Sequence, residues 1–239
     1  MKVTYLYHSG FLVELENHIL LFDYYKGELP EFSKEKTIYV FASHKHRDHF
    51  DFSIFELFHQ YENIHYFLGS DIRLSDRYLE RNGVSVKVKE KLTNLGADRN
   101  LKLPDIEIKT LRSTDAGVAF CVCCEGKSIY HAGDLNNWYW EGETEDYNNR
   151  MQANYEKEID KIAGTHFHAA FVPLDPRLEK AYGYGMDYFL KRAGDGCDYI
   201  FPMHMWEKYE YIHFYLETEI GKKFADKIVD IGEKIEIDI

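Results

Sequence analysis

Residues 44 to 49 read His44-Lys45-His46-Arg47-Asp48-His49 and follow directly on the apolar stretch 38–42. Three imidazoles and a carboxylate so close together are costly to bury without partners, and a solvated loop rarely needs so many coordinating groups. In an extended segment His44 and His46 lie on one side, so both rings can reach a single ion. Asp48 and His49 come after a turn and can face a second ion, since two-metal hydrolytic sites hold their ions about 3.5–4 Å apart. The pattern predicts metal binding rather than a histidine-rich surface loop.

This HxHxDH cluster and three further motifs resemble the metallo-β-lactamase superfamily, whose hallmark is HxHxDH in the loop after a strand. The further motifs are Leu20-Leu21-Phe22-Asp23, Ala132-Gly133-Asp134 and Phe201-Pro202-Met203-His204. The opening Tyr7-His8-Ser9-Gly10-Phe11-Leu12-Val13 is similar to the branch of L-ascorbate-6-phosphate lactonase and N-acyl-phosphatidylethanolamine phospholipase D. The resemblance implies an α/β fold, the αββα four-layer sandwich, and a hydrolase, but it does not identify a substrate.

The resemblance also implies a set of metal ligands. The first ion takes His44 and His46, the second takes Asp48, His49 and His204, and Asp134 bridges the two. We expect Asp48 and Asp134 to act in catalysis as well. A water shared by two divalent ions would have a pKa near 7, which generates hydroxide at neutral pH without a separate strong base.

One departure from the family pattern concerns the first ion. The family supplies a third histidine from the loop before the second hairpin, but residues 112–117 contain none. Asp115 is the only strong ligand in that loop, so it either replaces the histidine or caps a turn. A carboxylate there would make the site neutral rather than positive and would favour harder ions. We therefore expect two divalent metal ions, zinc first, with manganese or iron as alternatives.

Three residues are candidates for substrate contact. His8 follows a strand at a position that lies beside the site in the resembling branch. Arg177 either holds a phosphate or carboxylate bidentately or forms a salt bridge with Asp175 or another acidic residue of a loop. Trp138 belongs to the aromatic stretch 136–140 and either lines the cleft or packs in the core. These features favour a small anionic substrate, such as a lactone or a phosphoester.

Other histidines carry weaker signals. His166 and His168 form a second HxH pair, but they lead into a strand and join no family motif, so we assign them no metal. His131 either orients a ligand or is a hydrogen-bonded core residue. His18, His59, His65 and His213 are assigned no chemistry.

Composition bounds the class of protein. The chain has 239 residues, 45% of them hydrophobic, and no apolar run approaches the about 20 residues needed to cross a bilayer. We expect one domain over residues 1–239 and, because a strand pattern begins at once, a cytoplasmic protein without a signal peptide. A formal charge of −12 without a Lys/Arg cluster makes nucleic acid an unlikely partner. The three cysteines within 121–124 are expected to be small buried hydrophobes.

Two other functions remain open. A catalytically silent metal-binding or sensor module is consistent with the absent third histidine. A di-iron oxidoreductase on this fold would normally be joined to a flavin-binding domain, and the chain is too short to contain one. The sequence does not indicate the oligomeric state.

The chain divides into two similar halves. Residues 11–23 read as strand, turn, strand and terminal Asp, and residues 120–134 repeat this pattern with Glu125-Gly126 as the hairpin turn. Helices are predicted from Ser53 to Tyr61, from Ser70 or Asp71 to a stop at Asn82-Gly83, from Met151 to Ile162 and from Tyr209 to Val229. A strand is predicted from Ile64 to Leu68, and a short terminal strand around Ile235.

Overall fold

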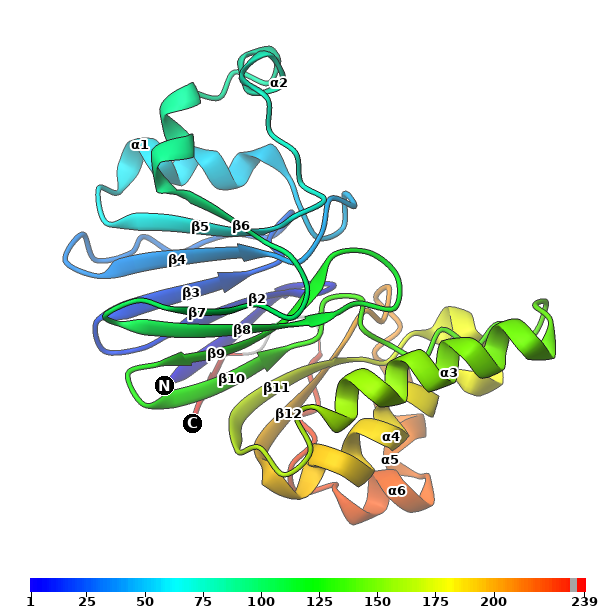
Figure 1. Cartoon of the computed structure of the whole chain (residues 1–239). Helices are drawn as coiled ribbons and strands as arrows, with labels where there is room; N and C mark the ends of the chain where they lie inside the picture. Colours follow the sequence, from blue (N-terminus) through cyan, green and yellow to red (C-terminus); the bar gives the residue numbers. More distant parts are fainter. Residues whose placement is uncertain (233–235) are drawn as a thin grey trace. The chain divides into compact units, whose positions relative to one another are not determined.

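The computed structural model describes residues 1–232 and 236–239 of the chain (Figure 1). Two compact units make up the described chain, and each is built around one β-sheet. The first unit is Met1–Gly96 with the terminal segment Lys234–Ile239, and the second is Ala97–Glu233. Each unit contains one of the two hairpin repeats that the sequence predicts.

The sheet of the first unit is mixed and has the strand order β13-β1-β2-β3-β4-β5-β6. Its four edge-side strands β13, β1, β2 and β3 pair antiparallel, whereas β3 to β6 run parallel. Every residue of β3 is buried, as expected of a strand covered on both faces. The strands are β1 Lys2–Tyr7, β2 Gly10–Glu14, β3 His18–Phe22, β4 Thr37–Ala42, β5 Ile64–Gly69, β6 Leu92–Leu95 and β13 Glu236–Asp238.

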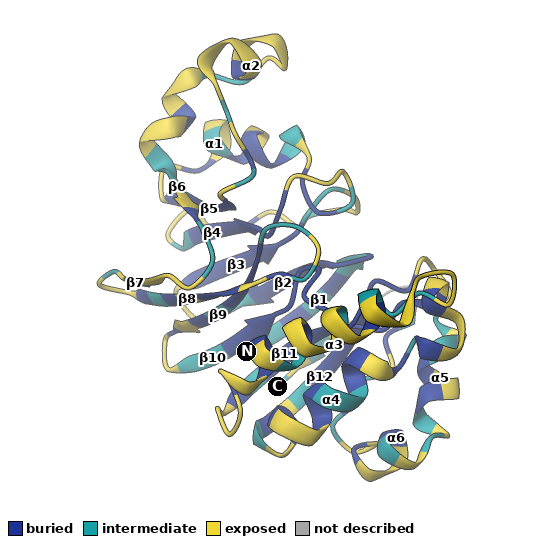
Figure 2. Cartoon of the chain, turned by 45° about the vertical axis from the view of Figure 1, so that its right-hand side comes forward, coloured by how far each residue is buried: buried dark blue, intermediate teal, exposed yellow. Residues whose placement is uncertain are grey.

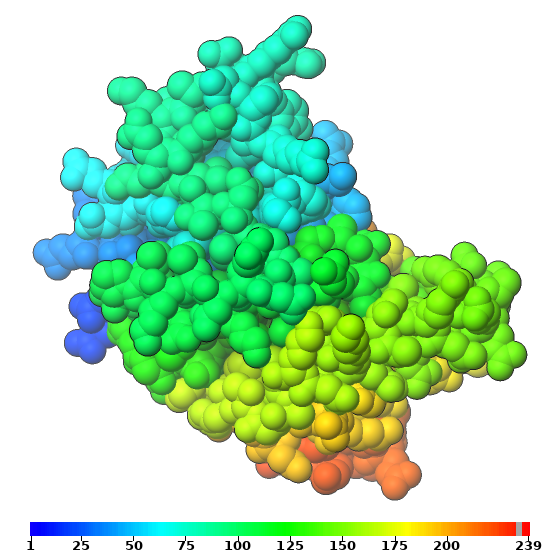
Figure 3. All heavy atoms as spheres, viewed as in Figure 1, coloured from blue at the N-terminus to red at the C-terminus, as the bar shows by residue number. Residues whose placement is uncertain are grey.

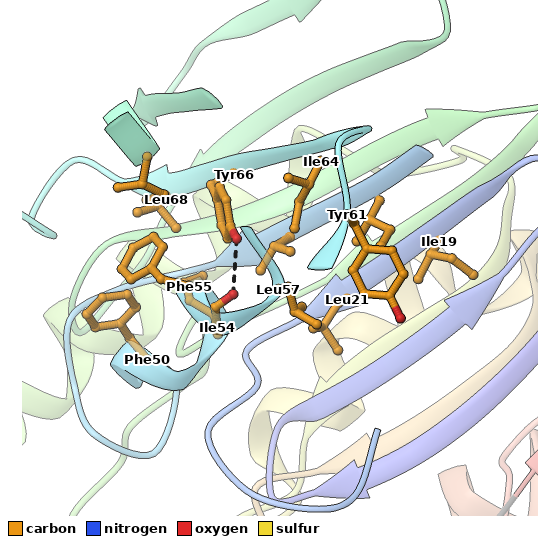
Figure 4. Close-up of a cluster of buried hydrophobic side chains, with 14 of the residues drawn as sticks. Ile19, Leu21, Phe50, Ile54, Phe55, Leu57, Tyr61, Ile64, Tyr66 and Leu68 are labelled. Atoms are coloured by element: carbon orange, nitrogen blue, oxygen red, sulfur yellow. Dashed lines mark hydrogen bonds between the residues drawn. The ribbon is translucent and has the colours of Figure 1, made fainter. Parts of the chain in front are cut away.

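Short helices cover one face of this sheet. The 3-10 helix η1 (Phe52–Glu56) and α1 (Leu57–Gln60) bury Ile54 and Phe55 against strand residues such as Tyr66. Figure 4 shows this core, in which the Tyr66 hydroxyl donates to the Ile54 carbonyl at 3.1 Å. The remaining helices of the unit are α2 (Asp76–Arg81) and the 3-10 helix η2 (Val86–Lys91).

Two predicted helix starts in this unit are wrong. Asp51, not Ser53, accepts the first backbone N–H of the helical segment before Tyr61. The next helix begins at Asp76 behind the cap Ser75 rather than at Ser70 or Asp71, because several residues in this stretch are good caps and packing selects among them. The predicted strand Ile64–Leu68 is confirmed as β5.

The sheet of the second unit is also mixed, with the order β12-β11-β10-β9-β8-β7. Strands β10, β11 and β12 run parallel, and the others pair antiparallel. The predicted hairpin turn is confirmed, because Glu125 and Gly126 both have positive φ, 49° and 72°. The strands are β7 Asn100–Lys102, β8 Ile106–Arg112, β9 Val118–Cys124, β10 Lys127–His131, β11 Phe167–Pro173 and β12 Cys197–Met203.

Helices of the second unit pack beside β11 and β12. Helix α3 (Glu145–Asp160) lies along α4 (Tyr184–Ala193), buries Tyr155 and Ile159 and leaves its opposite face exposed (Figure 2). The start predicted at Met151 is wrong, since Thr144 caps the helix and the acidic residues of its first turn favour the positive end of the helix dipole. The shorter helices are η3 Pro176–Ala181, η4 Gly194–Gly196, α5 Glu210–Leu216 and α6 Glu219–Lys223.

Further sequence predictions are corrected near the carboxyl end and in β9. The single helix predicted over 209–229 is two helices, α5 and α6, separated by the cap Thr218. The terminal strand is β13, and Ile235 lies outside the described residues. Cys123 is exposed and Cys121 is half-buried, so only Cys124 of this run is the buried hydrophobe expected. Strand alternation puts Cys121 and Cys123 on the opposite face from Cys124.

Among the described residues, no helix combines the length and the apolar character needed to cross a membrane.

Candidate metal centre

A buried carboxylate, Asp23, organises the candidate ligands of the first unit. It follows β3, has no exposed surface, and lies beside the end of β4 because these two strands are parallel neighbours. Its carboxylate accepts the backbone N–H of Ser43 at 2.7 Å, the Ser43 hydroxyl at 2.7 Å and Nδ1 of His49 at 2.6 Å. A carboxylate can only accept here, so His49 carries its proton on Nδ1 and keeps the Nε2 lone pair for a cation.

The same hydrogen-bond chain sets the ring of His44. The Ser43 hydroxyl donates its one proton to Asp23, so it accepts from Nδ1 of His44, which lies 2.9 Å away. Nε2 of His44 therefore presents a lone pair, and it faces Nδ1 of His46 at 2.9 Å. Two ring nitrogens at this spacing suit a shared ion, as the alternation of His44 and His46 predicts.

His8 and Asp48 complete the arrangement in the first unit. One ligand atom each from His8, Asp48 and His49 lies within 4.8 Å of the others. The Asp48 carboxylate is 3.4 Å from Nε2 of His8 and 3.9 Å from Nε2 of His49. Burial raises the pKa of the Asp48 carboxyl, but hydrogen bonding from His8 and the nearby His49 ring outweigh burial and hold that pKa well below its usual range.

In the second unit a carboxylate likewise orients the late histidine. His204 follows β12, and its Nδ1 lies 2.8 Å from the Asp175 carboxylate, which has no exposed surface. Nε2 of His204 is 3.2 Å from the Asp134 carboxylate. Burial raises the pKa of Asp175, but hydrogen bonds from His204 and Arg177 outweigh it and lower that pKa to about 2. Asp175 is therefore ionised at neutral pH and holds the His204 proton on Nδ1.

Asp115 lies near the predicted bridging residue. One carboxylate oxygen of Asp115 and one of Asp134 lie within 4.8 Å of each other. The backbone N–H of Asp115 donates to the Ser113 hydroxyl at 3.2 Å, so this serine caps the turn at that amide. The position suits the predicted ligand role of Asp115.

In the structure, Arg177 contacts Asp175 and Trp138 contacts the backbone of Asp134. Arg177 donates through Nε to both Asp175 oxygens, at 3.1 and 2.9 Å, which is the salt bridge that the sequence left open as an alternative. Its guanidinium also lies 4.9 Å from the centre of the Trp206 ring. Trp138 is buried, and its Nε1 donates to the backbone carbonyl of Asp134 at 2.9 Å. Their predicted contacts with substrate stay predictions.

Backbone strain occurs at three of these positions. His8, Asp23 and His204 have φ of 56°, 42° and 68°, a region that non-glycine residues rarely adopt. Such strain persists where surrounding contacts over-determine it, and it gathers at functional sites. The orienting roles of Ser43 and Asp175 were not predicted, and the only sequence signal for them is their position just after a buried strand.

The second HxH pair also has an acidic neighbour in the second unit. Ligand atoms of His166, His168 and Asp198 lie within 4.8 Å of one another. However, Nε2 of His166 faces both Asp198 oxygens at 3.1 Å, and Nδ1 of His168 accepts the Ser128 backbone N–H at 3.1 Å. The neutral His168 ring then carries its proton on Nε2, which leaves no lone pair there for a metal.

A family model described as a beta-lactamase superfamily domain matches residues 2–146, more than half of the 239-residue chain. The chain belongs to the metallo-β-lactamase superfamily. This match confirms the superfamily part of the sequence interpretation, whereas the resemblance to the ascorbate-6-phosphate lactonase branch stays a prediction.

The chain is also similar to a curated relative and to solved structures. A UPF0173 metal-dependent hydrolase from Opitutus terrae is 34% identical over 146 residues, which cover 56% of this chain and 63% of that protein. The metallo-β-lactamase fold protein YhfI from Bacillus subtilis has 14% identity and a TM-score of 0.61, with 99% of each chain covered. CmlA, a diiron β-hydroxylase from Streptomyces venezuelae, has 10% identity and a TM-score of 0.64, with 100% of this chain and 54% of CmlA covered.

The predicted fold class is confirmed by these structural likenesses: the chain has the metallo-β-lactamase αββα fold, with two mixed sheets and flanking helices. The donor groups also fit the divalent ions of the superfamily. His44, His49 and His204 each have their proton held on Nδ1, which leaves Nε2 as the metal-binding atom. Asp48 and Asp134 provide carboxylates beside these rings.

Proposed function

We propose that this chain is a metal-dependent hydrolase whose histidines and aspartates hold two divalent ions. The observation that carries the proposal is the tautomer control in each unit. Buried Asp23 and Asp175 each fix the proton on Nδ1 of a histidine, so that Nε2 is available to a cation. A histidine that serves only the fold does not require a buried carboxylate at Nδ1. A histidine that binds a metal through Nε2 almost always has such a partner at its other ring nitrogen.

The chemistry follows from general properties of such centres. Two divalent ions bound here would lower the pKa of a shared water to about 7 and polarise the group that is attacked. Asp134 would hold the attacking oxygen in place, and the Trp138 indole N–H keeps the backbone of Asp134 in position. Asp48, whose pKa lies below its usual range, stays ionised and can bind a cation at neutral pH.

The finer assignments are part of the same proposal. His44, His46 and Asp115 would bind the first ion, and Asp48, His49 and His204 the second, with Asp134 between them. Zinc is the first choice of metal, and manganese or iron is favoured if Asp115 binds, because an added carboxylate suits harder ions. The substrate would be a small anionic lactone or phosphoester, which the similarity of residues 7–13 to the lactonase branch supports. The name of the Opitutus terrae relative, a metal-dependent hydrolase, is consistent with this reaction class.

The proposal is tested by assaying the purified chain, loaded with zinc, manganese or iron(II), against a panel of lactones and nitrophenyl phosphoesters. We expect turnover with at least one metal, and a loss of about a hundredfold or more in Asp134→Asn. Asp146→Asn removes an exposed carboxylate of the same unit and should leave the rate unchanged. Equal rates for Asp134→Asn and the unchanged chain would refute the assignment.

A metal-binding sensor module is the second candidate, and Asp115 in place of a histidine favours it. A sensor binds metal stoichiometrically without turning over any member of the panel. Its metal affinity should fall in Asp134→Asn even though no activity is present to lose. The likeness to the diiron hydroxylase CmlA is one of fold alone and supports no oxidative reaction.

A further inference from the structure

A cavity of about 390 Å³ lies in the first unit, beside the HxHxDH loop, and none of the candidate metal ligands lines it. Three segments form its wall: the loop 45–52, the segment 71–74 that follows β5, and helix α2 with its end. The volume lies in the range of pockets that bind small molecules. In the space-filling view, α2 and its neighbours form an exposed projection of this unit (Figure 3). We call this cavity the basic recess.

The charge of the basic recess is unusual for this protein. Its lining includes the exposed cations Lys45, Arg47 and Arg73, in a chain whose formal charge is −12. Among the described residues, none of these three cations has a carboxylate within ion-pair distance. The lining is therefore able to hold an anion through guanidinium and ammonium groups.

Two carboxylates in the same lining are engaged by backbone amides. Asp71 accepts the backbone N–H of Lys45 at 3.2 Å, and Asp51 accepts the backbone N–H of Ser53 at 2.8 Å. Three cations and two carboxylates leave the basic recess net positive. The amide contacts of the carboxylates also shape the wall, since Asp71 holds the loop at Lys45.

The floor of the basic recess is apolar and partly aromatic. Phe50 and Ile72 are buried beneath it, and the rings of Phe52 and Tyr78 meet edge to face with 5.2 Å between their centres. Tyr78 remains 45% exposed, so part of its ring is open to solvent. A ring or short carbon chain that carries an anionic group would place its apolar part on this floor.

The position of the basic recess relates it to the candidate metal ligands of the same loop. Lys45 and Arg47 alternate along the chain with His44, His46 and Asp48. Consecutive Cα atoms lie about 3.8 Å apart, so each of these cations is attached one residue from a candidate ligand. The recess and the candidate ligands His44, His46 and Asp48 therefore share one loop.

We propose that the basic recess binds the anionic end of the substrate, a phosphate or carboxylate joined to a ring or short carbon chain. This inference rests on the proposed function for the statement that the bound molecule is a substrate. The anion site itself is a separate property of the first unit, formed by Arg47, Arg73 and Lys45 over the apolar floor.

Calorimetric titration of the full chain with phenyl phosphate, benzoate and neutral benzyl alcohol tests the anion site, with the metal-loaded and the EDTA-dialysed protein compared. In Arg73→Gln and Arg47→Gln the Kd for the preferred anion should rise about tenfold, since each variant loses one charged hydrogen bond. Arg77→Gln removes an equal charge from α2 but does not line the recess, so its Kd should stay unchanged. Comparison of phenyl phosphate with benzoate shows which anion is preferred.

Two outcomes would overturn the inference. One is an equal Kd for Arg73→Gln, Arg47→Gln and Arg77→Gln, and the other is anion binding that disappears on EDTA dialysis, which would locate the anion at the metals. Circular dichroism of each variant verifies that these exposed substitutions leave the fold intact.

The titration separates this inference from the proposed function. If no substrate in the panel is turned over but Arg73→Gln weakens anion binding, the recess is an anion site and the hydrolase proposal fails. If turnover is found, Arg73→Gln should raise KM for an anionic ester about tenfold relative to its neutral counterpart and leave kcat unchanged. An equal response of KM to both esters would refute the recess while the hydrolase stands.

Discussion

Replacing Asp23 by asparagine should reverse the tautomers of two histidines by exchanging one oxygen for an NH2 group. In the folded chain the two Asp23 oxygens accept three hydrogen bonds, two from Ser43 and one from Nδ1 of His49. The amide side chain of the Asp23→Asn variant has the same shape and keeps one acceptor oxygen, which can retain the bond from the Ser43 backbone. Its NH2 group, in the place of the second oxygen, faces the Ser43 hydroxyl and Nδ1 of His49 as a donor.

Both neighbours must then become acceptors. The Ser43 hydroxyl turns its proton toward Nδ1 of His44, and both His44 and His49 move their proton to Nε2. Nε2 is the atom that would bind a cation, so metal affinity should fall about 10- to 100-fold. In the metal-free chain, three hydrogen bonds to a charged group become hydrogen bonds between neutral groups, at a cost of about 1 kcal/mol each. Because an amide is easier to bury than a carboxylate, the net decrease in the free energy of unfolding should be about 2 kcal/mol.

The measurements are zinc titration calorimetry and urea unfolding of the EDTA-dialysed protein. Asp76→Asn, which removes an exposed carboxylate paired with Lys89 in the same unit, is the matched control and should change stability by less than about 0.5 kcal/mol. The reasoning is wrong if Asp23→Asn binds zinc as tightly as the unchanged chain. A loss of stability with full zinc affinity would show that Asp23 serves the fold alone.

Three further predictions concern single residues. Asp115→Ala should weaken binding of the first metal ion and Asp115→His should restore it, and unchanged metal content in both variants would exclude Asp115 as a ligand. Burial raises the pKa of the Cys197 thiol to about 12, so iodoacetamide at pH 8 should label the exposed Cys123 in the native protein and leave Cys197 unlabelled by mass spectrometry. Burial, and then the charge of Lys91, lower the pKa of His65, so the unfolded chain binds this proton more readily. The contribution of His65 to the free energy of unfolding should therefore be complete above pH about 6.5, its pKa in the unfolded chain, and should decline as the pH falls toward its pKa in the folded chain. Urea unfolding of the His65→Gln variant should show a smaller decline.

Local patterns in the sequence predicted most of the strands and the position of the histidine cluster. The hairpin at Glu125-Gly126 was predictable because two residues with positive φ form the turn, and short-range turn chemistry decides it. The starts of α2 and α3 were not predictable in this way. For α2, the residues Ser70, Asp71 and Ser75 are all acceptable caps, and for α3 the acidic first turn also resembles a loop. Choosing between such caps depends on which helical face finds a buried partner, and that partner is distant along the chain.

By itself the sequence determined which groups are available: the HxHxDH cluster after a buried strand, the later Asp134 and His204, and the superfamily to which they belong. Only the tertiary structure decided how the rings are oriented, because Asp23 reaches Ser43 and His49 across neighbouring strands and Asp175 reaches His204 in the same way. Ligand identity is local, since residue type and spacing along one loop define it. The tautomer of a buried imidazole depends on whichever acceptor packs against Nδ1, and packing between distant segments determines that acceptor.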